Sequence, residues 1–193
     1  MVDNLSLLHH KNDPMNKNDL INTKSTLCPC GSKQLYSKCC EPCHLSHAVA
    51  QRPEHLMRSR YSAFVLRQFH YLITTHHADY LHGLTEQQLA QGDVQWLGLQ
   101  VLSSKQESDH GEVTFKAWFI EDKHIDAIYE CSSFIKQDGC WFYTHGQQMQ
   151  TPLPSRNDAC ICSSGKKFKL CCAKLGISVL NNHEIHDCSI NRL

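Results

Sequence analysis

Apolar side chains recur every three to four residues between Pro53 and His76. They are Met57, Tyr61, Phe64, Val65, Phe69, Leu72 and Ile73. This spacing places them on one face of an α-helix, so it predicts a helix from Pro53 to about His76. Pro53 suits the first helical turn, where its missing N–H is not needed. A second, shorter helix is predicted over 85–91, with Thr85 as N-cap and Gly92 as its stop.

From Val94 onward the period of the pattern changes to two. Apolar and polar residues alternate over 97–101, 112–119 and 125–133, and a last strand is predicted over 140–144. The Asp138-Gly139 pair is a hairpin signal, and loops are expected near 103–111 and 121–123. A long helix followed by an antiparallel meander predicts an α+β fold, with helices on one face of a curved sheet.

Cysteines are concentrated in two short frames, one on each side of this middle segment. The chain has 12 cysteines, and each frame reads C-x-C, eight residues, C-C. The eight residues concerned are Cys28, Cys30, Cys39 and Cys40 in the first frame, and Cys160, Cys162, Cys171 and Cys172 in the second. Adjacent cysteines and C-x-C pairs are poor local disulfides, whereas four thiolates suit tetrahedral zinc. The frames therefore predict two structural zinc ions per chain. In the first frame, Cys43 and His44 remain alternatives to Cys40 as fourth ligand.

Composition and charge indicate which ligands suit the middle segment and in which compartment the protein is expected. Residues 51–150 carry 8 Lys/Arg and 12 Asp/Glu, a net charge of −4, so the middle segment is not suited to nucleic acid. The first residues lack a basic start and a long apolar core, and no stretch is long enough to span a membrane. A cytoplasmic location is predicted, where thiols stay reduced and cysteine clusters usually bind metal.

The predicted organisation has five parts. A poorly ordered polar tail over 1–26 precedes the first zinc module, which covers 27–47. An α+β domain follows over 48–150, and the second zinc module covers 151–175. A weakly ordered tail is expected over 176–193, because its residues are mostly polar and show no period.

The cysteine frames resemble the SEC-C motif, which is also found at the C-terminus of the SecA translocation ATPase. In SecA the last ligand is usually His, whereas both copies here have Cys. The second copy, with Ser164, Gly165, Lys166, Lys167 and Phe168, resembles the motif more closely than the first, which has Lys33-Gln34 where Gly-Lys is usual.

The arrangement over 27–173 resembles the YchJ-like bacterial proteins of uncharacterised function. The residues that carry this resemblance are the two frames and the run Leu56-Met57-Arg58-Ser59-Arg60-Tyr61-Ser62-Ala63-Phe64. It implies a cone-like middle domain of the nuclear-transport-factor-2-like (NTF2-like) type, the fold that ketosteroid-isomerase-like enzymes also use. The expected architecture is this cone flanked by two SEC-C zinc modules.

A cone-like fold implies a pocket between the helix and the sheet. The residues expected to line it are Arg58, Arg60, Tyr61, Trp96, Trp118, Glu130, Trp141 and Tyr143. Candidates for an acid or base there are His76, His77, Asp79, Asp126 and Glu130. Aromatic residues on alternating strand positions are more often core, and Asp126 and Glu130 more often lie on a solvated face. Arg58 and Arg60 could bind an anion, but pairing with a sheet carboxylate such as Glu130 is favoured. No catalytic residue is assigned.

Two function hypotheses remain. The first is a zinc-binding adaptor whose two four-cysteine elements dock onto a partner protein, with contacts made by Lys166, Lys167, Phe168 and Lys169. The alternative is an enzyme acting on a small molecule in the pocket of the middle domain. A pocket filled by its own aromatic side chains would count against the enzyme.

Overall fold

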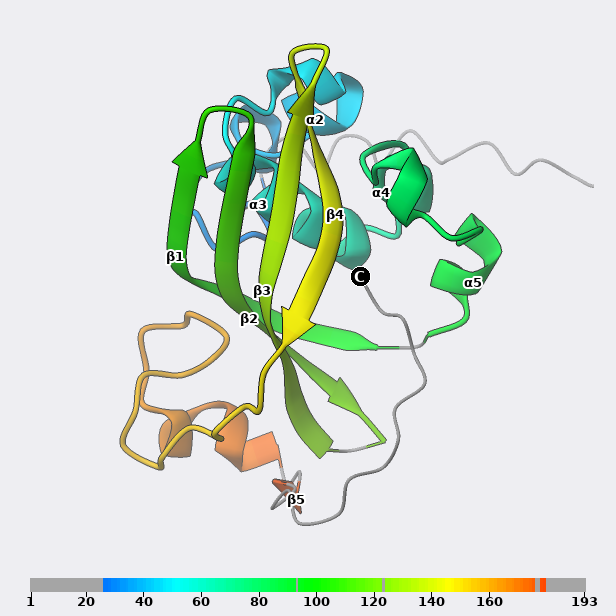
Figure 1. Cartoon of the computed structure of the whole chain (residues 1–193). Helices are drawn as coiled ribbons and strands as arrows, with labels where there is room; N and C mark the ends of the chain where they lie inside the picture. Colours follow the sequence, from blue (N-terminus) through cyan, green and yellow to red (C-terminus); the bar gives the residue numbers. More distant parts are fainter. Residues whose placement is uncertain (1–25, 93, 123, 176–177, 180–193) are drawn as a thin grey trace, which may run out of the picture.

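The structure is a computed structural model that describes residues 26–92, 94–122, 124–175 and 178–179. The predicted tails at 1–26 and 176–193 lie outside this part of the chain, except for residue 26 and residues 178–179. At its centre is an antiparallel sheet in the order β1-β2-β3-β4 (Figure 1). Its strands are β1 Gln95–Glu107, β2 His110–Glu121, β3 His124–Gln137 and β4 Cys140–Gln148, and a short strand, β5 Ser178–Val179, pairs in parallel with β3.

The first hairpin is longer than predicted. The loop expected near 103–111 is strand except at Ser108 and Asp109, because Ser103 pairs with Thr114 and Glu107 with His110. Residues 102–107 are exposed. Since neither face of this part of β1 is buried, its sequence lacks the alternation that reveals a strand. The turn predicted at Asp138-Gly139 is confirmed, with a positive φ at both residues.

The prediction of a single long helix from Pro53 to about His76 is wrong. The chain forms α3 Pro53–Val65 and a separate helix, α4 Phe69–Thr74. Arg67 has a φ of 56°, and the N–H of Gln68 bonds to the carbonyl of Ala63 at 2.8 Å, as at many helix C-termini. The chain then turns so that α4 lies against α3, and the Ser59 and Tyr71 hydroxyls are 2.7 Å apart.

The remaining helices are short. The first cysteine frame contains η1 Tyr36–Lys38 and is followed by α2 Glu41–Leu45 and η2 His47–Val49. After α4 come η3 Ala78–Tyr80 and α5 Glu86–Ala90. Thr85 caps α5 as predicted, in a reciprocal capping box with Gln88. The second frame contains η4 Phe168–Leu170 and η5 Cys172–Leu175.

The sheet carries a hydrophobic cluster on each face. Neighbouring residues of a strand point to opposite faces, and Phe119 packs in a cluster with α3 and the first frame, whereas Trp118 packs with the second frame. Helix α3 lies behind the sheet in Figure 1, and the second frame lies at the lower end of the strands. The α+β architecture and the cone-like arrangement are confirmed, with one cysteine module on each face.

Candidate metal centres and the interior of the middle domain

The first cysteine frame gathers its four sulfur atoms at one point. The Sγ atoms of Cys28, Cys30, Cys39 and Cys40 all lie within 4.8 Å of one another. The Cys30–Cys39 separation is 3.5 Å and the Cys39–Cys40 separation is 3.9 Å. Zn–S bonds of about 2.3 Å in a tetrahedron require sulfur separations of about 3.8 Å. These four residues therefore fit a tetrahedral metal ion.

Cys40 and not His44 completes this group. The His44 ring accepts a hydrogen bond from the Tyr36 hydroxyl at 2.7 Å and donates one to the Ser59 carbonyl at 2.8 Å. Both ring nitrogens are therefore engaged elsewhere. Cys43 lies outside the four-sulfur group, although its side chain is buried close by.

The second frame repeats the same local structure. Its four sulfurs, from Cys160, Cys162, Cys171 and Cys172, are also within 4.8 Å of one another. In each frame the N–H of the first cysteine bonds to the carbonyl six residues on, at 2.7 Å for Cys28 and 2.8 Å for Cys160. In each, the serine after the C-x-C pair approaches the third cysteine, at 3.1 Å for Ser32 and 3.3 Å for Ser164. One sequence frame therefore forms the same metal-binding turn twice.

One cysteine in each frame has a lowered pKa, whereas hydrogen bonds with neighbouring thiols raise the pKa of Cys40 and burial raises that of Cys172. Burial opposes ionisation of Cys160, but backbone N–H groups of Cys162 and Cys172 and the neighbouring thiols lower its pKa to about 6. Hydrogen bonds from Cys28 and Cys40 hold the pKa of Cys30 well below its ordinary value. Because the thiolate is the form that binds metal, each cluster suits a cation.

The start of α3 fastens the first module to the middle domain. Arg58 donates to the carbonyl of Cys30 at 3.0 Å and pairs with Glu54 at 2.8 Å. Ser62 of the same helix lies 3.6 Å from the Cys28 sulfur. Arg58 was predicted to line the pocket between helix and sheet or to pair with the sheet; instead it pairs with Glu54 and borders a different cavity, beside the first module. The helix begins beside the module, so this arginine reaches the metal-binding turn.

Arg60 and Glu130 are both buried in the interior of the middle domain. Arg60 is 3% exposed and donates to the Leu72 carbonyl and the Thr75 hydroxyl, both at 2.7 Å. Glu130 is 2% exposed and accepts from Ser132 at 2.5 Å, so it does not lie on a solvated face. A direct Arg60–Glu130 ion pair was expected. Instead the break after α3 brings the Leu72 carbonyl and the Thr75 hydroxyl to the guanidinium, which stacks over the Tyr143 ring at 4.7 Å.

The other residues predicted to line the pocket do not share one cavity. Tyr61 and Trp96 pack edge to face, with ring centroids 5.6 Å apart, and Trp96 meets Phe119 at 5.9 Å. Trp141 is fully buried in the same hydrophobic cluster. Trp118 lies on the opposite face, so its assignment to the pocket is wrong: neighbouring strand residues alternate between faces. Side chains of the domain itself therefore fill the space between α3 and the sheet.

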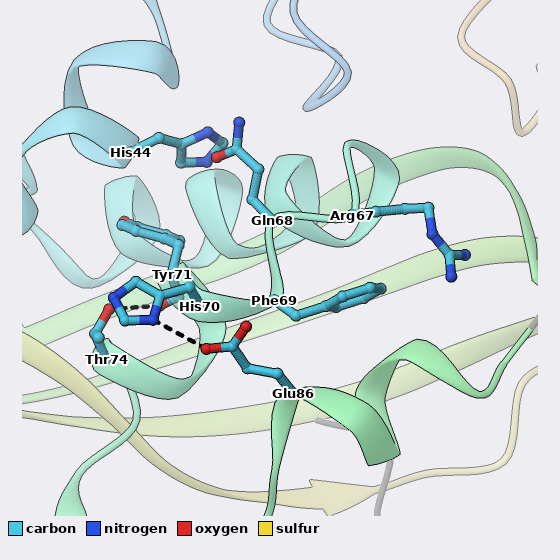
Figure 2. A pocket seen from close by; sticks show the side chains of 8 residues that line it. All are labelled: His44, Arg67, Gln68, Phe69, His70, Tyr71, Thr74 and Glu86. Carbon is cyan, nitrogen blue, oxygen red and sulfur yellow. Dashed lines mark hydrogen bonds and ion pairs between the residues drawn. The ribbon is translucent and has the colours of Figure 1, made fainter. Parts of the chain in front are cut away.

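A cavity of about 390 Å³ lies elsewhere, beside α4 and α5 (Figure 2). Its lining residues are His44, Arg67, Gln68, Phe69, His70, Tyr71, Thr74 and Glu86. Figure 2 shows His70 and Glu86 facing each other, and their exposed side chains form a hydrogen bond at 3.0 Å. Of the residues predicted to line a pocket, none borders this cavity. The sequence gives no signal for it, because it depends on the turn between α3 and α4.

The turn of the second module was predicted to contact a partner. Lys166 and Lys167 are exposed and Lys169 is half-buried. Phe168 is only 3% exposed and packs with Trp118 and Ile161. Its assignment to the partner contact is wrong, because the ring anchors the module to the sheet. The apolar residue that this turn does expose is Leu170.

No helix within the described ranges is long and apolar enough to cross a membrane.

Models of known families match each part of the chain. The model of the YchJ middle NTF2-like domain matches residues 52–146, and the SEC-C motif matches residues 25–42 and 156–174. The fold and the cysteine clusters thus define a SEC-C protein built on an NTF2-like domain. A UPF0225 protein of Shewanella sp. (strain ANA-3) is 54% identical over 162 residues, which cover 79% of this chain and 99% of the relative. The chain belongs to the YchJ-like UPF0225 family.

Two solved structures share this fold. A SEC-C motif-containing protein from Psychrobacter arcticus is 30% identical, with a TM-score of 0.58 over 79% of this chain and 98% of the other. RPA3114, a SEC-C motif-containing protein from Rhodopseudomonas palustris, is also 30% identical, with a TM-score of 0.60 over 65% of this chain and 100% of the other.

Proposed function

We propose that the protein is a zinc-binding adaptor whose two four-cysteine modules dock onto a partner protein. The observation that carries this proposal is the pair of matched clusters, each with four sulfurs within 4.8 Å of one another. Four protein ligands leave no open position for substrate, so such sites are structural. A bound zinc ion would hold the ends of each frame together and stabilise the turn between them.

The closed interior of the middle domain argues against an enzyme. Glu130, the candidate acid or base that lies inside the domain, is buried and hydrogen-bonded to neighbouring side chains. The second module exposes Lys166 and Lys167 on a turn that lies between its two cysteine pairs. This distribution supports binding of a partner over chemistry on a small molecule.

Metal stoichiometry tests the zinc assignment. Elemental analysis of the purified full chain should find two zinc ions per chain. Cys40→Ser should remove the ion of the first module, and Cys172→Ser that of the second, because each leaves three thiolates. Cys131→Ser, outside both frames, should change nothing. Full zinc content in either frame variant would contradict the ligand assignment.

Charge reversal on the second module tests the adaptor role. The variant Lys166→Glu/Lys167→Glu should lose partner capture in a cross-linking pull-down while keeping both zinc ions. The matched control, Lys105→Glu/Lys136→Glu, makes the same change in net charge on the sheet and should capture as the native chain does. If the first variant captures the same proteins as the native chain, this surface is not the contact.

A further inference from the structure

The fourth ligand of the first module also belongs to a second cysteine spacing. Cys40 is the N-cap of α2, and Cys43 lies three residues later in the run Cys40-Glu41-Pro42-Cys43. The N–H of His44 bonds to the Cys40 carbonyl at 3.1 Å, which closes this turn. The second module has no counterpart, because Leu175 stands three positions after Cys172.

The backbone brings these two cysteines to the separation that a disulfide needs. Residues three apart in a helical turn have Cα atoms about 5 Å from each other, within the roughly 4.4–6.8 Å found in disulfides. Cys43 is 5% exposed, yet it borders a cavity of about 250 Å³ that Cys39 and Cys40 also line. A metal ligand and a free cysteine therefore border the same small cavity.

We propose that Cys40 and Cys43 form a redox-sensitive pair that releases the metal ion of the first module when it is oxidised by hydrogen peroxide. The inference rests on the proposed zinc site, because a ligated Cys40 is held as thiolate, the nucleophilic form. Cys43 is the resolving thiol, which makes the reaction reversible by a reducing thiol.

The reaction has two steps. The Cys40 sulfur attacks one peroxide oxygen, the O–O bond breaks, and the products are a Cys40 sulfenic acid and hydroxide. The Cys43 sulfur then attacks the Cys40 sulfur; an S–S bond forms and the S–O bond breaks. The departing hydroxyl takes the Cys43 proton and leaves as water. Both sulfurs are oxidised and both peroxide oxygens are reduced.

Loss of Cys40 leaves the first module with three of its four thiolates. A structural zinc site needs all four to hold the ion tightly, so the ion is released. The second module has no cysteine at the equivalent position and keeps its ion. Oxidation therefore acts on one of two otherwise matched modules.

Peroxide titration of the metal-loaded full chain tests this inference. Zinc content is measured first, then release is followed with a chromogenic chelator, and disulfides are mapped by peptide mass spectrometry. The native chain should release one of its two zinc ions and yield a Cys40–Cys43 disulfide. Cys43→Ser should form no disulfide in the first module; without the resolving thiol its Cys40 over-oxidises, so it should not rebind zinc after a reducing thiol is added. The native chain and Cys131→Ser should rebind it.

The outcomes separate the two proposals. A chain purified in reducing buffer that holds no zinc overturns the proposed metal site itself. A zinc-loaded native chain that forms another disulfide, or keeps both ions, overturns the redox pair alone. So does equal rebinding of zinc by Cys43→Ser and the native chain after the reducing thiol is added. If Cys43→Ser does not fold, the disulfide map of the native chain decides.

Discussion

Two buried charged residues, Arg60 and Glu130, fill part of the interior of the middle domain and are held there by hydrogen bonds. Burial lowers the pKa of Arg60 to about 10, so it stays charged near neutrality, and α4 oxygens and the Tyr143 ring surround it. Burial also raises the pKa of Glu130, whose oxygens accept from Ser132 and Gln148. A buried charge left without partners would be costly, so these hydrogen bonds are needed to keep the network in place.

His76 in the same region makes stability depend on pH. Burial, and then the charge of Arg60, lowers its pKa to about 4. The unfolded chain has a His pKa near 6.5. The folded state thus favours neutral His76, and this stabilisation is present above pH about 6.5 and is lost as pH falls towards 4. His44 and His47 act in the same direction, since burial lowers their pKa too.

His76→Gln removes one part of this pH dependence, while its amide can still donate to the Thr144 carbonyl. Melting temperatures measured between pH 4.5 and 7.5 should fall less steeply on acidification than in the native chain. His70→Gln, at an exposed position, serves as control and should keep the native slope. An unchanged slope in His76→Gln would show that the residue is not buried in its neutral form.

The sequence predicted a strand or helix correctly where one face of the element is buried, because burial of one face gives a regular pattern of apolar residues. The alternation over 112–119 and 125–133 identifies β2 and β3, because both alternate between a hydrophobic cluster and a less buried side. The outer half of β1 lacks a buried face and was missed. The break between α3 and α4 was also missed, because Phe69 and Leu72 happen to continue the helical period across the turn.

The docking of the second module onto β1 depends on Gly98. A Cβ atom there would lie 2.3 Å from the Ile161 carbonyl oxygen and 3.2 Å from the Cys162 Cα. Gly98→Ala must push the module away from the strand, at a cost of about 1–3 kcal/mol. We expect a lower melting temperature, and extraction of one of the two metal ions at lower chelator concentration.

Gly92→Ala is the matched control for this change. A Cβ at position 92 would meet only the Val94 side chain at 3.8 Å, an ordinary contact. Its melting curve and chelator titration should match those of the native chain. If Gly98→Ala also matches them, the module is not held against β1 as the structure has it.

For the molecule as a whole, the metal ligands were easier to predict than the interior. All four sulfurs of a module come from 13 consecutive residues, so their spacing in the sequence nearly determines their geometry. The partners of Arg60 come from α4 and from β4, and only the three-dimensional arrangement brings them together. For the same reason Phe168 was expected on the surface, although it anchors a module to the opposite face of the sheet.

The two metal-binding turns are far apart in the sequence but meet beside β1. A Cβ at Gly31 would lie 3.6 Å from the Leu99 carbonyl oxygen and 3.9 Å from the Ser163 hydroxyl. In the proposed adaptor, a partner that contacts one turn would meet the other turn in the same contact area, at a high effective concentration and without a flexible linker to order. The proposed docking would then be bivalent, and loss of metal from either turn would remove the gain in affinity that comes from the two contacts together.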